Sequence, residues 1–330
     1  MSASTRPPIL LPNGVTLTAE DQRKLSWPGD HSASWLDSLP ETITQWCDRW
    51  RVTLDPRMPE INYNLVLFGT SEIHGPVVIK MAPPHPEGAA EMEAVHIAQQ
   101  PGVVRLYESD PSVSIMLQER VIPGTMLREH VERGEYTDDE ATRIAASCMK
   151  RFWTPAPHSP HLITLRHWFR DLYGYRERFP DGGGPIPKEF IDLALSHADY
   201  LLATEGERVT VHGDLNPGNI LRRQDDWVII DPKGLIGERG YEVGQWMLNP
   251  YGLHLWPNLV EALDTRLTIL SEMLELDRYR LWQWSVAHAV LSECWTVQEE
   301  AVDAEGLHAI EIVRALQQLP EAQRTIPSES

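Results

Sequence analysis

The residues best suited to chemistry lie in one stretch, Val209 to Gly234, which reads VTVHGDLNPGNILRRQDDWVIIDPKG. Asp214 and Asn219 share a polar loop after a first strand, and Asp231 ends the apolar run of a second strand. Phosphoryl transfer to a hydroxyl needs one carboxylate to accept the proton, and an amide and a second carboxylate to hold Mg²⁺ against the nucleotide phosphates. The stretch supplies this set of groups, and a hairpin would bring Asp231 back to the loop.

The same stretch resembles the catalytic and metal loops of the aminoglycoside phosphotransferase and protein-kinase-like superfamily. Its IDPKG ending is similar to the branch that contains streptomycin 6-kinases and hydroxyurea phosphotransferases. The resemblance implies that Asp214 is the catalytic base and that Asn219 and Asp231 bind Mg²⁺. It implies an α+β, two-lobed protein-kinase-like fold, with a small antiparallel-sheet N-terminal lobe, a mostly helical C-terminal lobe, and ATP as the phosphate donor.

Three other residues around these loops have roles that the sequence leaves open. His212 belongs to the catalytic loop (His212–Asn219), where an imidazole that braces the loop is favoured over a second base. Lys233, in the metal loop (Asp231–Gly234), is either a phosphate contact or a salt-bridge partner that closes the loop. Many relatives begin the next helix with Tyr-Asp, whereas this chain has Glu242 at the acidic position, so a bracing role for that acid stays open.

The elements that must position the nucleotide precede this stretch. Apolar runs and turns predict strands and one helix in the order strand, strand, helix, strand, strand, at 62–68, 76–81, 87–100, 103–107 and 114–119. Lys80, near the end of the second strand, resembles the family's phosphate-contacting lysine, which needs a carboxylate from the following helix. We prefer Glu91 over Glu93 as that carboxylate, because Glu91 shares a helical face with Ala94 and Val95.

The segment from Gln118 to Gly124 resembles the family's hinge between lobes. There the backbone of Glu119 to Val121 would pair with the purine edge, and a plain edge strand is the alternative. No Gly-x-Gly-x-x-Gly accompanies Lys80, so residues 57–62 are the segment expected by position to cover the phosphates. The hinge predicts two domains, residues 1–120 with the N-terminal arm, a helix and the nucleotide-binding lobe, and residues 121–330 with the catalytic and acceptor-binding helices.

Residues 1–33 are rich in Pro, Ser and Gly and are expected to form a loosely packed arm. A helix should follow from Ser34 to about Arg51, because its apolar residues recur at helical spacing. At the other end, the resemblance implies an acceptor site between the catalytic loop and the C-terminal helices, in which most tryptophans are expected to be core. Carboxylates that could attract an ammonium or guanidinium group there, with surface solvation as the alternative, are Glu293, Glu299, Glu300 and Asp303.

The composition limits the possible partners. The chain has 330 residues and a formal net charge of −19. Such an acidic balance disfavours nucleic acid and anionic membranes and favours cationic ligands. The cysteines, Cys47, Cys148 and Cys294, form no disulfide or zinc pattern, so a cytoplasmic setting is expected. We identify no signal peptide and no apolar run near the roughly 18–20 residues that a membrane span needs.

These features predict an ATP- and Mg²⁺-dependent kinase for a small, cationic, hydroxylated acceptor of the streptomycin type. A metabolic kinase for a sugar, an amino alcohol or a hydroxyurea-like acceptor is the alternative within the same chemistry. A pseudokinase is disfavoured because Lys80, Asp214, Asn219 and Asp231 are all present. A protein kinase lacks support because we find no Ala-Pro-Glu activation segment, and a Ser/His/Asp hydrolase because we find no Gly-x-Ser-x-Gly elbow.

Overall fold

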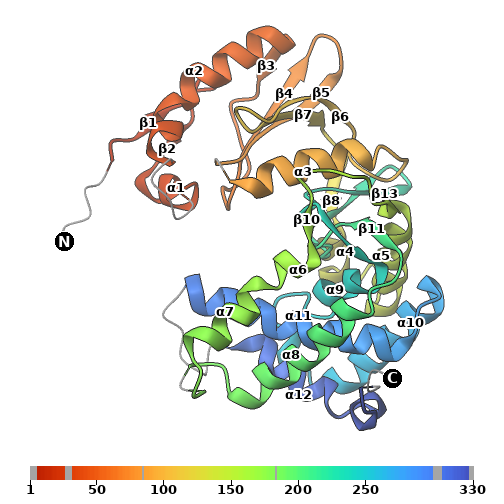
Figure 1. Ribbon diagram of the computed structural model, residues 1–330. Coiled ribbons are helices and arrows are strands. Elements are labelled where there is room, and N and C mark those ends of the chain that lie inside the picture. The colour runs from red at the N-terminus through yellow and green to blue at the C-terminus, as the bar shows by residue number, and fades with distance from the viewer. Residues whose placement is uncertain (1–5, 27–31, 84, 183, 300–306, 327–330) are drawn as a thin grey trace. The chain divides into compact units, whose positions relative to one another are not determined.

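The computed structural model describes residues 6–26, 32–83, 85–182, 184–299 and 307–326 (Figure 1). The chain folds into two units. Unit 1 comprises Met1–Gln99 and Val104–Ile122, and unit 2 comprises Gln100–Val103 and Pro123–Ser330. Unit 1 carries a five-stranded antiparallel sheet and unit 2 is mostly helical, which confirms the expected α+β class.

The sheet of unit 1 has the order β3-β4-β5-β7-β6. Its strands are β3 (Val52–Leu54), β4 (Leu65–Ser71), β5 (Gly75–Met81), β6 (Leu106–Asp110) and β7 (Ile115–Glu119). Lys80 stands opposite Val66 on β4 and Met116 on β7, in the middle of the sheet. Two strands lie later in the sequence than predicted, since β4 and β6 each begin three residues after the expected position. The apolar Val103, predicted to open β6, pairs with Ile229 in unit 2.

Two helices belong to this sheet. In α2 (Ser32–Trp50) the apolar residues pack with those of β4, β5 and β7 in one core, as the helical spacing predicted. The helix α3 (Pro86–Ile97) packs near β6, and it begins with Pro86 at its first position, where a missing N–H is tolerated (Figure 1). Because side chains alternate along a strand, Lys80 points to the face opposite to Ile79, which lies in the α2 core.

The expectation of a loosely packed N-terminal arm is wrong for residues 6–26. This segment forms a hairpin of β1 (Ile9–Leu10) and β2 (Thr16–Leu17), followed by α1 (Ala19–Lys24), whose first turn has a capping box between Thr18 and Asp21. Leu11, Leu17 and Leu25 are buried in the same core as α2. Leu11, Leu17 and Leu25 do not recur at the spacing of a helix or a strand, so the sequence pattern did not reveal this packing.

Unit 2 contains two small sheets that carry the stretch from Val209 to Gly234. One has the order β10-β14-β11-β9 and the other β13-β12-β8. Their strands are β8 (Pro123–Met126), β9 (Thr154–Pro155), β10 (Ile163–Thr164), β11 (Arg208–Val211), β12 (Ile220–Arg223), β13 (Asp226–Ile229) and β14 (Leu235–Glu238). The catalytic loop connects β11 to β12, and the metal loop connects β13 to β14. The two loops therefore share both sheets.

Helices make up the rest of unit 2. They are α4 (Leu127–Glu132), α5 (Asp138–Phe152), α6 (Leu165–Trp168), α7 (Arg170–Arg178), α8 (Lys188–Ala203), α9 (Val243–Trp246), α10 (Leu259–Leu274), α11 (Arg278–Glu299) and α12 (His308–Leu316), with a short 3₁₀ helix η1 (Arg239–Glu242) before α9. Trp246, Trp282 and Trp284 are buried, as predicted for core residues. None of the helices in the described part of the chain has the length and apolar character to cross a membrane.

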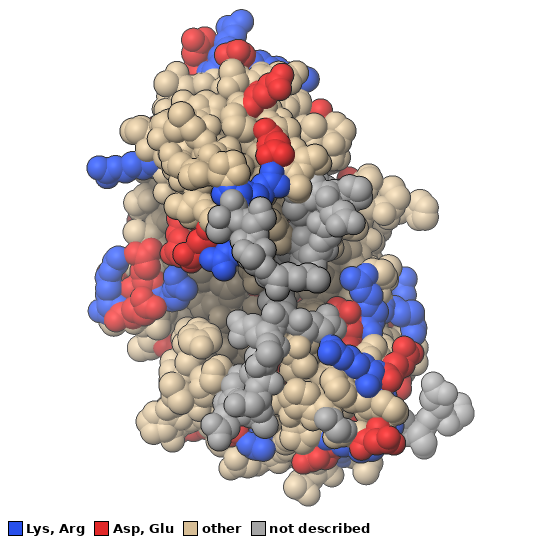
Figure 2. Space-filling model, turned by 90° about the vertical axis from the view of Figure 1, so that its left-hand side faces the viewer, with Lys and Arg blue, Asp and Glu red and all other residues tan. Residues whose placement is uncertain are grey.

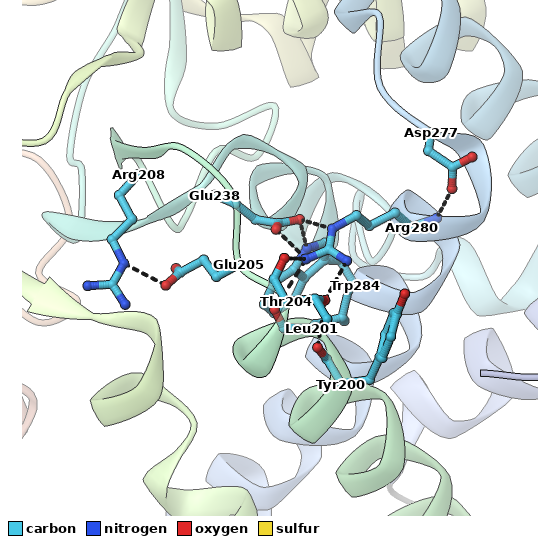
Figure 3. A network of polar contacts seen from close by, with 9 residues as sticks. All are labelled: Tyr200, Leu201, Thr204, Glu205, Arg208, Glu238, Asp277, Arg280 and Trp284. Carbon is cyan, nitrogen blue, oxygen red and sulfur yellow. Dashed lines mark hydrogen bonds and ion pairs between the residues drawn. The ribbon is translucent and has the colours of Figure 1, made fainter. Parts of the chain in front are cut away.

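A polar network fixes the end of β14 (Figure 3). Arg280, in the first turn of α11, reaches the buried Glu238 of β14 through Nε at 2.7 Å. The same guanidinium donates to the carbonyl oxygens of Leu201 and Thr204 at the C-terminal end of α8, at 3.2 and 3.1 Å. Trp284 also donates its indole N–H to Glu238. The network thus joins α8, α11 and β14 immediately before η1, which leads to Glu242.

Candidate active site

The β12–β13 hairpin brings the two polar loops of unit 2 together. Ile220 pairs with Ile229 in its antiparallel register, so the chain returns to the end of the catalytic loop just before Asp231. The N–H of Ile230 donates to the carbonyl of Asn219 at 3.0 Å, and the N–H of Lys233 donates to the carbonyl of His212 at 2.7 Å. The predicted hairpin is therefore present, and backbone hydrogen bonds fasten the metal loop to both ends of the catalytic loop.

His212 is fully buried and uses both ring nitrogens within these loops. Nε2 lies 2.8 Å from the carbonyl oxygen of Ile230, and because a carbonyl can only accept, Nε2 carries the proton. Nδ1 is then the acceptor for the N–H of Asp214 at 3.2 Å. With both nitrogens engaged, this imidazole is suited to bracing the loop.

The backbone at Gly213 adopts a conformation that strongly favours glycine. Its φ is +79°, and a Cβ there would lie 2.6 Å from Cδ1 of Leu235. Glu242 holds the same backbone, because its carboxylate accepts the N–H groups of His212 and Gly213 at 2.7 and 2.9 Å. Burial raises the pKa of Glu242 to about 7, although these hydrogen bonds act in the opposite direction. The longer acidic side chain at this position thus braces the catalytic loop.

The carboxylate of Asp214 is held unequally at its two oxygens. Oδ1 accepts from Nε2 of Gln245 at 2.8 Å and from Nδ2 of Asn216 at 3.1 Å, whereas Oδ2 has one weak contact, 3.3 Å from Nδ2 of Asn219. Burial raises the pKa of Asp214, and the charge of Lys233 opposes that rise. Oδ2 is therefore the oxygen best placed to accept a proton.

Gln245 is a site residue that sequence reasoning missed. It lies on α9, one turn after Tyr241, and nothing in its local sequence marks it as a partner of the catalytic loop. The only available signal was the position of this helix directly after the metal loop.

Asn219 and Asp231 fit the requirements of a Mg²⁺ ion, which prefers oxygen ligands. Nδ2 of Asn219 donates to the carbonyl of Asp214 at 2.8 Å, and its amide oxygen accepts no hydrogen bond from the residues that the structure describes. Asp231 has a φ of +61°. This conformation is rare for a residue with a side chain, and such strain is concentrated at functional sites. The donor set is thus an amide oxygen and a carboxylate on loops that are fastened together.

Unit 1 contains a buried ion pair between Lys80 and Glu91. Nζ of Lys80 lies 2.6 Å from Oε1 of Glu91, and the two side chains are 3% and 8% exposed. Glu91 lies on the buried face of α3 with Ala94 and Val95, whereas Glu93 is only half-buried. Of the two candidate carboxylates, the structure places Glu91 on the lysine.

The predicted purine-binding segment follows β7 in unit 1. The N–H of Glu119 donates to the carbonyl oxygen of Arg105 at 2.9 Å, and the N–H of Arg120 donates to the carbonyl oxygen of Pro76 at 3.2 Å. Both N–H groups are therefore used within the sheet. The N–H of Val121 has no partner among the described residues. Val121 therefore offers the free donor that pairing with a purine edge requires.

Most of the carboxylates predicted to contact the acceptor lie outside the described residues. Glu300 and Asp303, and the side chain of Glu299, lie outside the described residues. Glu293 is 3% exposed and accepts the N–H of Ala309 at the start of α12, and its burial raises its pKa to about 6. Neither proposed role, acceptor contact or surface charge, describes Glu293, because it caps α12 from inside the core.

Comparisons with known proteins identify the family of the chain. The family model described as "Aminoglycoside/hydroxyurea antibiotic resistance kinase" matches residues 49–300. The streptomycin 6-kinase of Streptomyces glaucescens is 27% identical over 284 residues, which cover 82% of this chain and 87% of that protein. The streptomycin 3''-kinase of Klebsiella pneumoniae is 28% identical over 260 residues, covering 76% of this chain and 90% of its own length.

The fold is also found among solved structures. A choline/ethanolamine kinase family protein from Mesorhizobium loti superposes with a TM-score of 0.56 at 15% identity, covering 92% of this chain and 95% of that chain. At this identity the similarity concerns the fold alone. It confirms the expected two-lobed protein-kinase-like class.

Proposed function

The chain belongs to the family of aminoglycoside/hydroxyurea antibiotic resistance kinases, and from this membership we propose that it transfers a phosphoryl group from ATP, with Mg²⁺, to a hydroxyl of a streptomycin-type aminoglycoside. The observation that carries the proposal is the uneven binding of the Asp214 carboxylate. Oδ1 is tied down by two amides, and Oδ2 is left to accept a proton. Asn219 lies in the catalytic loop and Asp231 in the metal loop, and backbone hydrogen bonds join these two loops.

Each residue of the site has its own role in the proposed reaction. Asp214 orients the acceptor hydroxyl and takes its proton at Oδ2, and the raised pKa of this carboxyl strengthens it as a base. Asn219 and Asp231 would hold Mg²⁺, which when bound neutralises charge on the phosphate oxygens. Lys80, braced by Glu91, fixes the nucleotide phosphates, and the Val121 N–H pairs with the purine edge.

Lys233 and His212 complete the site. We assign Lys233 to the transferred phosphate, where its positive charge also opposes the rise in the pKa of Asp214. His212 holds the main chain of Asp214 and stays out of the proton transfer. Most of the rate acceleration then comes from positioning and charge neutralisation.

The streptomycin-type acceptor rests on the relatives and on charge. The two streptomycin kinases are named for different positions, 6 and 3'', so the proposal covers the class of acceptor and leaves the hydroxyl open. A net charge of −19 favours a cationic ligand. Figure 2 shows acidic and basic side chains interspersed on one face, so that on this face the net charge forms no single acidic patch. Recognition would therefore depend on individual carboxylates.

One observation favours a second candidate. Glu293, the one described carboxylate among those expected to attract a cation, is buried under α12. A neutral hydroxylated acceptor, such as hydroxyurea or a sugar, needs no such carboxylate. This candidate keeps the same chemistry and the same residue roles.

The experiment is an ADP-release assay with Mg·ATP against streptomycin, other aminoglycosides, hydroxyurea and a panel of sugars and amino alcohols. Turnover with streptomycin, together with a product heavier by one phosphate, is the expected result. Turnover with hydroxyurea or a sugar alone would replace the first candidate by the second. No ADP release with any acceptor would contradict both.

A further inference from the structure

A chain of hydrogen bonds leads from the Asp214 carboxylate into the helical core. Gln245 donates to Oδ1 of Asp214 at 2.8 Å, and its own amide oxygen lies 2.9 Å from Nε2 of His288 on α11. Nδ1 of His288 lies 2.9 Å from the hydroxyl of Tyr241, which in turn lies 2.7 Å from the indole Nε1 of Trp168. The five side chains come from the catalytic loop, α9, α11, η1 and α6.

Donor and acceptor chemistry fixes the direction of every bond in this chain. The indole N–H of Trp168 can only donate, so the Tyr241 oxygen accepts from it. The buried Tyr241 hydroxyl has no acceptor other than Nδ1 of His288 among the described residues, so its proton goes to that nitrogen. A neutral His288 must then carry its proton on Nε2 and donate it to the amide oxygen of Gln245. Burial lowers the pKa of His288 to about 4, which keeps the ring neutral. The NH₂ group of Gln245 is therefore turned toward Asp214.

The packing of α9 on α11 is built for this contact. A Cβ on Gly244 would lie 2.6 Å from Cβ of His288, so only glycine allows the two helices to approach this closely. Tyr241 and His288 are each 1% exposed. Neither side chain has room to turn without breaking buried hydrogen bonds, which is costly.

We propose that Gln245 is a positioning residue for Asp214, with its amide oriented by the buried Tyr241–His288 pair so that Oδ2 is the oxygen that takes the acceptor proton. This inference rests on the proposed function, in which Asp214 is the base. Gln245 acts through Asp214 and does not touch the reacting atoms. A carboxylate that is free to rotate would offer either oxygen and would lose the alignment on which proton transfer depends.

The kinetic test replaces Gln245 by leucine and compares it with Gln283→Leu. Gln283 is the control, because it is another glutamine of unit 2 that hydrogen-bonds a histidine, His197, at 3.2 Å, and among the described residues it makes no hydrogen bond to the catalytic loop. For Q245L we expect kcat to fall about 10-fold or more with the KM for ATP unchanged. The acid limb of kcat/KM should move to higher pH, since a bond to the ionised carboxylate is lost. For Q283L, kcat and the position of the acid limb should both match the wild type.

A second measurement reads the orientation of the chain without any acceptor. Long-range ¹H–¹⁵N spectra of histidine-labelled full-length protein, with His288 assigned through the His288→Asn variant, should show a neutral ring protonated at Nε2. A ring protonated at Nδ1 would turn the Gln245 oxygen toward the carboxylate and overturn the inference. So would wild-type kcat and an unshifted acid limb in Q245L.

The two proposals fail in different ways. If wild-type protein releases no ADP with any acceptor, the proposed function fails, while the protonation state of His288 is still measured. If Asp214→Asn loses turnover but Q245L keeps it, the kinase assignment stands and the role of Gln245 is refuted. Tyr241→Phe adds a check, because in the Q245L background it should cause no further loss of kcat.

Discussion

The carboxylate of Glu242 holds the main chain of His212, accepting its N–H at 2.7 Å from the end of η1. The bond connects the start of the catalytic loop to the segment that follows the metal loop. It is made in a fully buried setting, where an unpaired N–H group would be expensive. The shape of the loop that carries Asp214 thus depends on a side chain that contacts neither nucleotide nor acceptor in the proposed mechanism.

Replacing Glu242 by glutamine should weaken this hold and change how stability depends on pH. One of the two backbone N–H groups would face an NH₂ group, so we expect a loss of about 1–3 kcal/mol in the free energy of unfolding near pH 5. The folded pKa of about 7 lies above the ordinary value of 4.5, so the folded wild type binds more protons than the unfolded chain between these values. Wild-type stability should therefore fall as pH rises through this window.

The measurement is denaturant unfolding of the wild type and E242Q at pH 5 and pH 8. The stability difference between them should shrink toward pH 8, because the variant has no group that titrates at this position. A difference that grows with pH would show that the pKa of Glu242 is lowered.

Lys80→Met should impair both stability and nucleotide binding. It breaks the buried ion pair by removing the lysine, a change that typically destabilises a protein by about 3–5 kcal/mol. In the double variant Lys80→Met, Glu91→Leu, stability should return while ATP affinity stays low, because neither replacement supplies the amine with which Lys80 binds the nucleotide phosphates. Chemical denaturation and calorimetric titration of ATP separate the two effects. Glu93→Gln is the matched control on α3, and ATP binding restored by the double variant would refute the role of Lys80.

The acid limb of the pH–rate profile should lie above the range of an ordinary aspartate. Burial raises the pKa of Asp214, so kcat/KM should be lost as the pH falls through this raised value. The charge of Lys233 opposes the rise, and Lys233→Met should move the limb to still higher pH. Lys150→Met, which removes an exposed lysine paired with Glu275, should leave the limb in place. An unchanged limb in K233M would contradict the electrostatic link.

Gly213→Ala should be more harmful than the same change at another glycine of positive φ. At Gly134, with a φ of +71° and open space around the Cβ position, alanine carries only the conformational cost of about 1 kcal/mol. At Gly213 the Cβ would also collide with Leu235. We expect G213A to lower both stability and kcat, and G134A to lower stability slightly without affecting kcat. Equal effects of the two variants would show that the Leu235 side chain moves aside without a cost in stability.

The parts of the site that could be predicted from sequence are those encoded locally. Asp214, Asn219 and Asp231 lie on one hairpin, and the preference for Glu91 followed from the helical face it shares with Ala94. The bond between Gln245 and Asp214 could not be predicted, because it depends on the direction in which α9 leaves η1 and on how closely Gly244 lets α11 approach.

The two clearest errors have the same physical origin. Leu11 of the N-terminal arm is buried by contacts with residues distant in sequence, and Glu293 caps a helix that begins fifteen positions later, at His308. Neither contact produces a periodic pattern in its own segment. Propensity and spacing describe a segment, whereas burial is decided by what packs against it.

The most direct test compares the wild type with Asp214→Asn. The asparagine keeps the size of the side chain and removes the base, so ADP release with Mg·ATP and streptomycin should fall by about 100-fold or more, while calorimetry shows ATP affinity within a few-fold of the wild type. Mass spectrometry of the wild-type reaction should show streptomycin carrying one added phosphate. Wild-type rates in D214N would contradict the assignment of Asp214 as the base.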